Sequence, residues 1–122
     1  MELTVNTAPV YASTGGKDFN PELPTVLFLH GSGMDHRAWA LQTRWFAYHG
    51  YSVLAPDLPG HSLSGGEAFA SIEDSGPWLD AFLNAAGVRA AHVVGHSQGF
   101  LSALELASIA PARFLSLTAV GT

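Results

Sequence analysis

Three short, mostly apolar runs alternate with segments of helical length, and this alternation constrains the fold more than any other feature. The runs cover residues 25–29, 51–55 and 91–95. The first lies between Pro24 and Gly31, and the second follows Gly50. A strand that is apolar at nearly every position suits a parallel sheet, where both faces are buried. The alternation therefore predicts an α/β fold with a mostly parallel sheet and flanking helices.

The remaining segments fit the same architecture. Residues 3–5 and 10–13 are expected to form a short antiparallel pair, and residues 114–120 a further strand. Asp35 is expected to cap a helix over residues 37–49 whose buried face carries four residues at helical spacing: Ala38, Leu41, Trp45 and Phe46.

Two more helices complete the expected alternation. Pro77 is tolerated in the first turn of a helix, so a second helix is expected to start there, with Ser75 or Gly76 as its cap. Gly87 is expected to end it. Residues 100–110 are apolar nearly all round, which predicts a buried helix that Pro111 stops.

Length and composition exclude several classes of protein. A chain of 122 residues holds at most one domain. It has no cysteine, so it can form neither a disulfide framework nor a thiolate metal site. Its net charge is −5 with only five Lys and Arg residues, which excludes a basic surface for nucleic acid. No apolar run approaches a membrane span and no signal peptide is visible, so we expect a cytoplasmic protein.

The segment Gly95-His96-Ser97-Gln98-Gly99 lies between a predicted strand and a predicted helix. It fits the pattern G-x-S-x-G, in which a sharp strand-to-helix turn exposes a strained serine above the sheet. The glycines give room where side chains would collide with the neighbouring strand and helix. At a helix N-terminus, free N–H groups also favour a developing negative charge. The context predicts Ser97 as a nucleophile.

A second glycine-rich turn, His30-Gly31-Ser32-Gly33, directly follows the strand at residues 25–29. Such a turn lets backbone N–H groups face a ligand. Together with the N–H of Gln98, the N–H of Ser32 would form an oxyanion hole. We expect His30, Gly31 and Gly33 to shape this turn, and Gly95 and Gly99 to shape the turn at Ser97.

With Asp57-Leu58-Pro59-Gly60-His61, these motifs make the sequence resemble the α/β-hydrolase family, in its carboxylesterase-like branch. The resemblance covers nearly the whole chain and implies a Ser–His–Asp triad with Ser97 as nucleophile. It also implies hydrolysis of a carboxylic ester or related acyl bond through an acyl-enzyme, with no cofactor. Ser62 stands where the family usually has glycine.

The resemblance also exposes an absence. In the family the triad acid and histidine follow the serine. All six histidines precede Ser97, and Glu105 is the only acidic residue after it. We therefore expect residues 1–122 to be the N-terminal part of one α/β-hydrolase domain, cut after about strand six. The triad acid and histidine would lie beyond Thr122, and this chain alone would be inactive.

The other polar residues have simpler interpretations. His96 is expected to pack or form a hydrogen bond, and Asp57 to be a turn-former and hydrogen-bond acceptor rather than the triad acid. His61 is a weak candidate for a substitute base. The histidines lack the i, i+4 pairing of a helical metal site, so we expect no metal. Four apolar residues are expected in the core: Trp45, Phe46, Phe100 and Leu104.

Alternative functions stay open at this point. The same scaffold supports acyltransferase, thioesterase, perhydrolase and carbon–carbon hydrolase chemistry, and fold alone does not separate them. A non-catalytic remnant that binds a ligand or partner is a further alternative. The expected partner is a small-molecule acyl substrate. If the sheet ends at the strand 114–120, its exposed edge also favours self-association.

Overall fold

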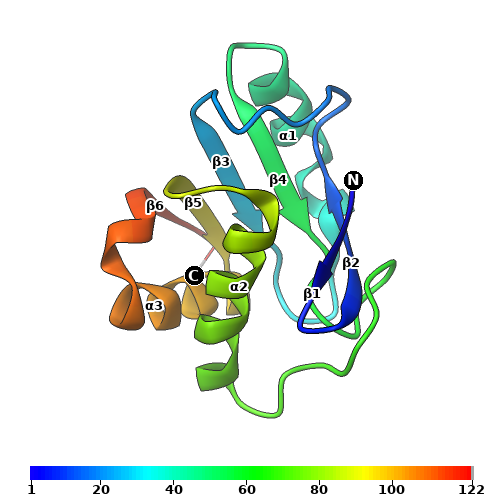
Figure 1. The fold of residues 1–122 in the computed structure, drawn as a ribbon, viewed down its shortest axis with the longest axis vertical. Helices are drawn as coiled ribbons and strands as arrows, with labels where there is room; N and C mark the ends of the chain where they lie inside the picture. The colour runs from blue at the N-terminus through cyan, green and yellow to red at the C-terminus, as the bar shows by residue number, and fades with distance from the viewer. Residues whose placement is uncertain (122) are drawn as a thin grey trace.

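The alternating segments form one six-stranded sheet in a computed structural model that describes residues 1–121 (Figure 1). The strand order is β1-β2-β4-β3-β5-β6. β1 pairs antiparallel with β2, and β2 pairs antiparallel with β4, whereas β4, β3, β5 and β6 run parallel. The strands are β1 (Glu2–Val5), β2 (Ala8–Ser13), β3 (Thr25–Leu29), β4 (Ser52–Pro56), β5 (Ala91–His96) and β6 (Phe114–Val120). The predicted fold class is confirmed.

Three α-helices cover the two faces of this sheet. They are α1 (Ala40–Ala47), α2 (Ser75–Ala86) and α3 (Gln98–Ile109). Short 3₁₀ turns lie at His36–Trp39, Ile72–Asp74 and Pro111–Arg113. Within residues 1–121 no helix is long and apolar enough to cross a membrane.

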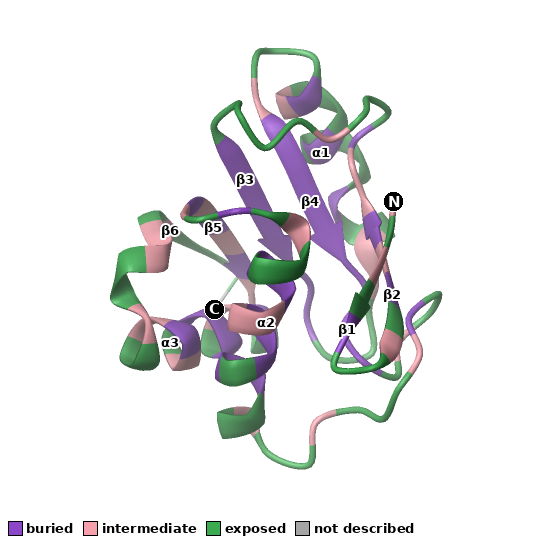
Figure 2. Ribbon diagram, in the orientation of Figure 1, coloured by how far each residue is buried: buried purple, intermediate pink, exposed green. Residues whose placement is uncertain are grey.

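β3 shows how the two layers of core arise. Its five residues are all buried, and alternate side chains point to opposite faces. Leu27 and Leu29 belong to the core that the sheet shares with α2 and α3, whereas Val26 and Phe28 belong to a smaller core under α1. Figure 2 shows β3 and β4 as the most continuously buried strands. Because β3 is buried on both faces, it fixes the position of the turn at residues 30–33 that follows it.

The predicted buried face of the first helix is wrong. Leu41 is 82% exposed and Trp45 is 54% exposed, while Trp39, Thr43 and Ala47 are buried. The segment begins as a 3₁₀ turn, which has three residues per turn and shifts the phase of the α-helix that follows. The buried residues accordingly recur every four positions from Trp39. Asp35 caps the turn as predicted, accepting a hydrogen bond from the Arg37 N–H.

The predicted start of the second helix is also wrong. The helical region is capped at Ser71, which forms a reciprocal capping box with Asp74 before a 3₁₀ turn leads into α2. Ser75 and Gly76 are buried helical residues, and Pro77 lies in the first turn of α2. The predicted end is confirmed, because Gly87 adopts a left-handed conformation at φ 73°.

The helix α3 is more exposed than predicted, whereas the exposure of the last strand, β6, agrees with the expected exposed edge. Leu101, Leu104 and Ile109 are 47%, 43% and 54% exposed, so α3 is buried on one face and not all round. β6 is the last strand in the sheet order and is mostly exposed (Figure 2). With Trp45, Leu104 is thus a residue wrongly assigned to the core. Phe46 and Phe100 are half-buried.

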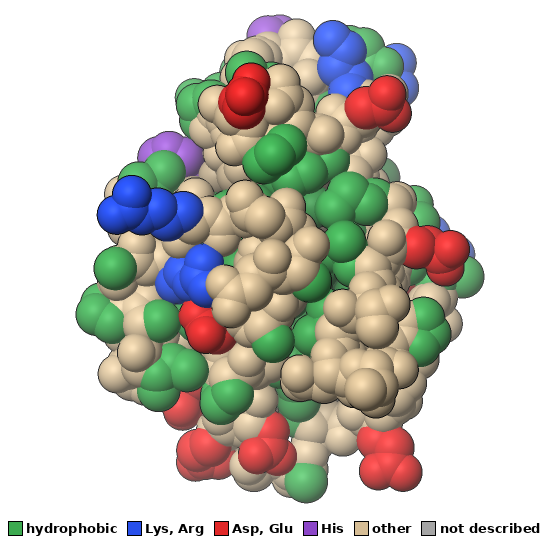
Figure 3. Space-filling view, in the orientation of Figure 1, with side chains coloured by type: hydrophobic (Ala, Val, Ile, Leu, Met, Phe, Trp, Pro, Cys, Tyr) green, Lys and Arg blue, Asp and Glu red, His purple; other side chains and the backbone are tan. Residues whose placement is uncertain are grey.

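Charged side chains are spread over the surface. On the face shown in Figure 3, Lys and Arg side chains form small separate groups with acidic side chains nearby. One partly buried ion pair among them joins Arg113, just before β6, to Asp80 of α2 at 2.9 Å. The visible face therefore carries no continuous basic stripe.

Candidate active site

Ser97 is the single residue between β5 and α3. Its backbone has φ 52° and ψ −114°, a conformation that a residue with a side chain rarely adopts. Its side chain is exposed. The Ser97 carbonyl accepts the Phe100 N–H at 3.0 Å, which closes the first turn of α3. The chain thus turns sharply from strand to helix, as the glycine-flanked motif predicts.

Gly95 and Gly99 leave no room for a side chain. A Cβ on Gly95 would lie 2.6 Å from both the amide nitrogen and the Cα of Phe100. A Cβ on Gly99 would overlap the Leu29 carbonyl and lie 2.8 Å from the His30 carbonyl oxygen. Because these neighbours are backbone atoms, they cannot rotate away. The close approach fixes the start of α3 against the end of β3.

The turn after β3 lies beside Ser97 because of the strand register. Leu29 of β3 is paired with Gly95 of β5, so both strands end at the same edge of the sheet. A Cβ on Gly31 would meet the His96 side chain at 3.2 Å, which shows how closely the two turns approach. Gly33 adopts φ 76° with open space around it. The positive φ, and not a lack of space for a side chain, therefore explains why glycine stands at position 33.

His30 is completely buried and both of its ring nitrogens are engaged. Nε2 accepts the Leu58 N–H at 3.0 Å, so the proton lies on Nδ1, which donates to the Gly31 carbonyl at 2.7 Å. Burial lowers the pKa of His30 below its usual 6.5, which favours this neutral form. His30 thus ties the 30–33 turn to the chain after β4.

His61 makes a second link between the same two segments. Its Nε2 accepts the Gly33 N–H at 3.3 Å, and its Nδ1 donates to the Pro59 carbonyl at 3.0 Å. The rings of His61 and His30 lie 5.1 Å apart between centroids. Both ring nitrogens of His61 are therefore occupied, which weighs against its use as a substitute base.

A cavity of about 210 Å³ lies at this edge of the sheet. Ser32 and Gln98, the two residues expected to donate backbone N–H groups, both line it. The rest of its wall is His61, Ser102, Leu58 and residues 68–72. Ser97 is exposed next to Gln98 and is not part of the wall. The cavity can hold a small molecule beside Gln98, the residue that follows Ser97.

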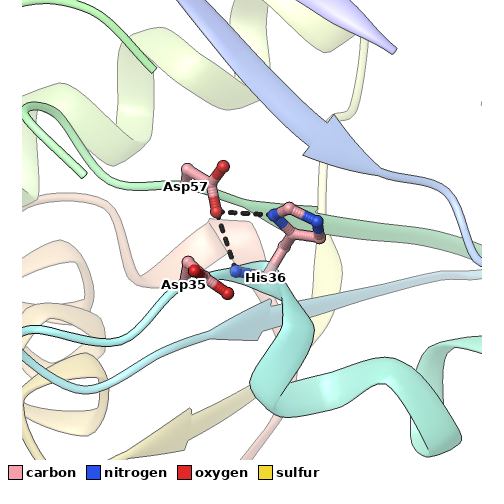
Figure 4. A group of neighbouring side chains, drawn as sticks. All are labelled: Asp35, His36 and Asp57. Carbon is pink, nitrogen blue, oxygen red and sulfur yellow. Dashed lines mark hydrogen bonds and ion pairs between the residues drawn. The ribbon is translucent and has the colours of Figure 1, made fainter. Parts of the chain in front are cut away.

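Asp57, at the end of β4, is fully buried and serves as a hydrogen-bond acceptor (Figure 4). Its Oδ1 accepts the His36 backbone N–H at 2.7 Å and pairs with His36 Nδ1 at 2.8 Å, and its Oδ2 accepts the Leu63 N–H at 3.1 Å. This geometry agrees with the expected role as a turn-former.

Asp35 brings a second carboxylate close to this pair, and one ligand atom from each of Asp35, His36 and Asp57 lies within 4.8 Å of the others. Arg37 binds both oxygens of Asp35, with its Nη2 at 2.6 Å from Oδ2, and holds the pKa of Asp35 well below its usual range. Because protein donors already occupy both carboxylates, we assign the group to loop structure.

Sequence reasoning missed the wall of the cavity opposite the two turns. Residues 68–72 belong to an irregular segment before α2, and Ser102 lies in a helix that was expected to be buried all round. The available signal was position: Ser102 is four residues after Gln98, and i, i+4 residues share one helix face.

The chain resembles known proteins over nearly its whole length. A sequence model of the α/β-hydrolase fold family matches residues 24–122. The dihydrolipoyllysine-residue acetyltransferase component of the acetoin cleaving system of Cupriavidus necator is 40% identical over 111 residues, which cover 90% of this chain and 28% of that protein. An "AB hydrolase superfamily protein" of Gibberella zeae is 34% identical over 121 residues, which cover 98% of this chain and 43% of that protein.

A solved structure shares the backbone arrangement. A mutant of the Vigna radiata epoxide hydrolase matches all of this chain with a TM-score of 0.82 and 26% identity. The match covers 38% of the epoxide hydrolase chain. This chain therefore spans less than half the length of these three proteins.

Proposed function

The chain belongs to the α/β-hydrolase fold family, and on that premise we propose that Ser97 is the nucleophile of a serine hydrolase. In this proposal Ser97 Oγ attacks the carbonyl carbon of a carboxylic ester or related acyl bond. The backbone N–H groups of Ser32 and Gln98 hold the oxyanion, and water hydrolyses the acyl-enzyme. No cofactor takes part in these steps.

The strained conformation of Ser97 is the observation that carries the proposal. A residue with a side chain rarely adopts φ 52° and ψ −114°, and at Ser97 this conformation falls directly between a strand and a helix. Because Gly99 packs against the backbone of β3, the start of α3 is fixed and Ser97 is held in this conformation. Gln98, whose N–H is a proposed oxyanion donor, is the first residue of α3. The cavity beside Gln98 and Ser32 gives room for the acyl group.

The proton acceptor in this proposal is a histidine outside residues 1–122, together with its acid partner. Two histidines next to the two turns, His30 and His61, already use both ring nitrogens. The chain also spans only 28% and 43% of the two curated relatives, which leaves room for further catalytic groups in a longer protein. Without a base, a serine hydroxyl is a weak nucleophile.

Acyl transfer is a second candidate, favoured by the acetyltransferase name of the 40% identical relative. It would use the same acyl-enzyme at Ser97, with an alcohol, thiol or amine in place of water. Adding such an acceptor to a reaction with an activated ester distinguishes the two. A transferase would form the transfer product in preference to the free acid.

Covalent labelling with a fluorophosphonate tests the nucleophile. Ser97 Oγ would form a bond to phosphorus while fluoride leaves and the hydroxyl proton passes to solvent. We expect slow labelling on Ser97, mapped by peptide mass spectrometry and lost in Ser97→Ala. Ser62→Ala is the matched control, because Ser62 is also exposed with a positive φ but does not precede a helix.

Two outcomes would contradict parts of the proposal. Labelling spread evenly over exposed serines, or unchanged in Ser97→Ala, would remove Ser97 as the nucleophile. Rapid labelling of Ser97 would keep the nucleophile but show that a base lies within these 122 residues.

A further inference from the structure

The cavity beside the two turns contains an anomaly on α3. Ser102 lines the cavity and is 1% exposed, yet its hydroxyl oxygen has no hydrogen-bond partner. Among residues 1–121 only one other buried side-chain atom shares this condition, the Trp39 indole nitrogen under α1. Most buried hydroxyls are paired, because an unpaired one loses its hydrogen bonds to water without replacement.

No neighbouring group pairs with the Ser102 hydroxyl in place of water. Serines in helices commonly bond to a carbonyl in the preceding turn, as Ser108 does to Glu105 at 2.8 Å, but Ser102 makes no such bond. Two serines in the segment that leads into α2 are engaged in hydrogen bonds of their own. Ser71 takes part in its capping box, and Ser75 donates to the Ile72 carbonyl at 2.6 Å. The Ser102 hydroxyl is thus unpaired on a residue that lines the cavity, and a change of its side-chain rotamer is needed to turn it toward a bound molecule.

We propose that the Ser102 hydroxyl hydrogen-bonds a second polar group of the substrate, so that this cavity selects short acyl chains carrying a hydroxyl or carbonyl group. This inference rests on the proposed function, because it takes Gln98 and Ser32 as the site of the attacked carbonyl. A purely apolar acyl chain would leave the Ser102 hydroxyl unpaired in the bound state as well.

The helix sets the distance between the two polar groups. Gln98 and Ser102 lie four residues apart on α3, a rise of ~6 Å at 1.5 Å per residue. The carbonyl oxygen and the hydroxyl oxygen of an extended 4-hydroxyacyl group lie a comparable distance apart. The cavity volume of about 210 Å³ lies below the ~300–1,000 Å³ of sites for drug-sized ligands, so the acyl chain is short.

Two esters with the same number of non-hydrogen atoms test the selection. Methyl 4-hydroxybutanoate carries the second polar group, and methyl pentanoate replaces it with a methyl group. We expect the chain to bind the hydroxy ester about 2- to 10-fold more tightly in a nuclear magnetic resonance titration, the range for one additional neutral hydrogen bond. Ser102→Ala should abolish the preference, and Ser102→Thr should keep it.

Measuring the same titration in Ser97→Ala separates this inference from the proposed function. The preference for the hydroxy ester should survive there, because binding does not need the nucleophile. A preference that survives while fluorophosphonate labelling fails would overturn only the nucleophile. Equal affinity for both esters, or no saturable binding of the hydroxy ester, would overturn the role of Ser102.

Stability without ligand gives an independent readout. Since Ser102→Ala removes an unpaired buried hydroxyl, its Tm should equal or exceed that of the unmutated chain. Ser108→Ala is the matched control on the same helix, because it removes a hydroxyl that is bonded and exposed. A lower Tm in Ser102→Ala than in Ser108→Ala would show that the Ser102 hydroxyl is structural, and would overturn the inference.

Discussion

Replacing Ser97 with glycine should stabilise the protein relative to replacing it with alanine. The backbone at φ 52° and ψ −114° is close to the mirror image of ordinary extended backbone, which glycine adopts freely and other residues do not. Both variants remove a side chain that is exposed and has no hydrogen bond to the described residues. Their difference therefore isolates the cost of holding a side chain in this conformation.

The expected size follows from two opposing effects. A residue held in a sparsely populated backbone region costs about 1–3 kcal/mol, which glycine would relieve. Glycine also gives the unfolded chain more freedom, at a cost of about 0.4–1 kcal/mol relative to alanine. The midpoints of the two ranges leave Ser97→Gly more stable than Ser97→Ala by about 1.3 kcal/mol. Both variants would lack the nucleophile, so stability is compared between two inactive proteins.

Urea unfolding of both variants, at protein concentrations where unfolding is reversible, measures the difference as a shift in midpoint at unchanged slope. The same pair at Ser108 is the control. Ser108 lies in the last turn of α3, where Ser108→Gly should be less stable than Ser108→Ala by up to about 1 kcal/mol. If Ser97→Gly is also the less stable of its pair, Ser97 stores no backbone strain and the observation that carries the proposed function is lost.

Three further predictions concern the surroundings of Ser97 and the sheet edge. Burial lowers the pKa of His30, so the stability that neutral His30 contributes is complete above pH 6.5 and is lost as the pH falls through the lowered pKa. The urea midpoint should therefore fall more steeply between pH 8 and pH 5 in the unmutated chain than in His30→Asn. Gly99→Ala should destabilise by about 3 kcal/mol because the new methyl group overlaps backbone carbonyls; a midpoint no lower than that of Gly87→Ala, where space is open, would contradict this. We propose that two copies of the chain pair through the edge strand β6. Leu115→Lys on β6 should then lower the dimer fraction in sedimentation velocity more than Leu41→Lys on α1, and no dimer or equal effects would contradict pairing through this edge.

The strands could be predicted from the sequence because their signal is local. A run such as residues 25–29 is apolar throughout and lies between proline and glycine, and the structure places β3 at Thr25–Leu29. The strand at residues 114–120 also coincides with β6. The turn at Ser97 was predictable for the same reason, since the glycine spacing and the flanking elements together specify a strand-to-helix turn.

Helix faces and the cavity were less predictable because they depend on contacts between elements. The residues of α1 carry apolar groups on two faces, and only the phase set by the preceding 3₁₀ turn buries Thr43 rather than Leu41. Capping at Ser71 depends on a carboxylate three residues later. Residues 68–72 follow no periodic pattern, so nothing in the sequence placed them opposite Ser32.

The contacts around the two turns divide the proposed chemistry into two parts. Gly99 packs on the backbone of β3, Gly31 lies against His96, and His30 and His61 tie the 30–33 turn to the chain after β4. The proposed nucleophile and the two proposed oxyanion donors therefore belong to one closely packed unit whose geometry does not depend on a base. It follows that changes at His30 or Gly99 should slow the labelling of Ser97 although neither residue touches the reagent, because they shift N–H groups that must lie about 3 Å from the oxyanion. The base acts on a different part of the reaction, because it takes the proton of the attacking hydroxyl in the transition state. The absence of a base therefore lowers the reaction rate without moving the N–H groups.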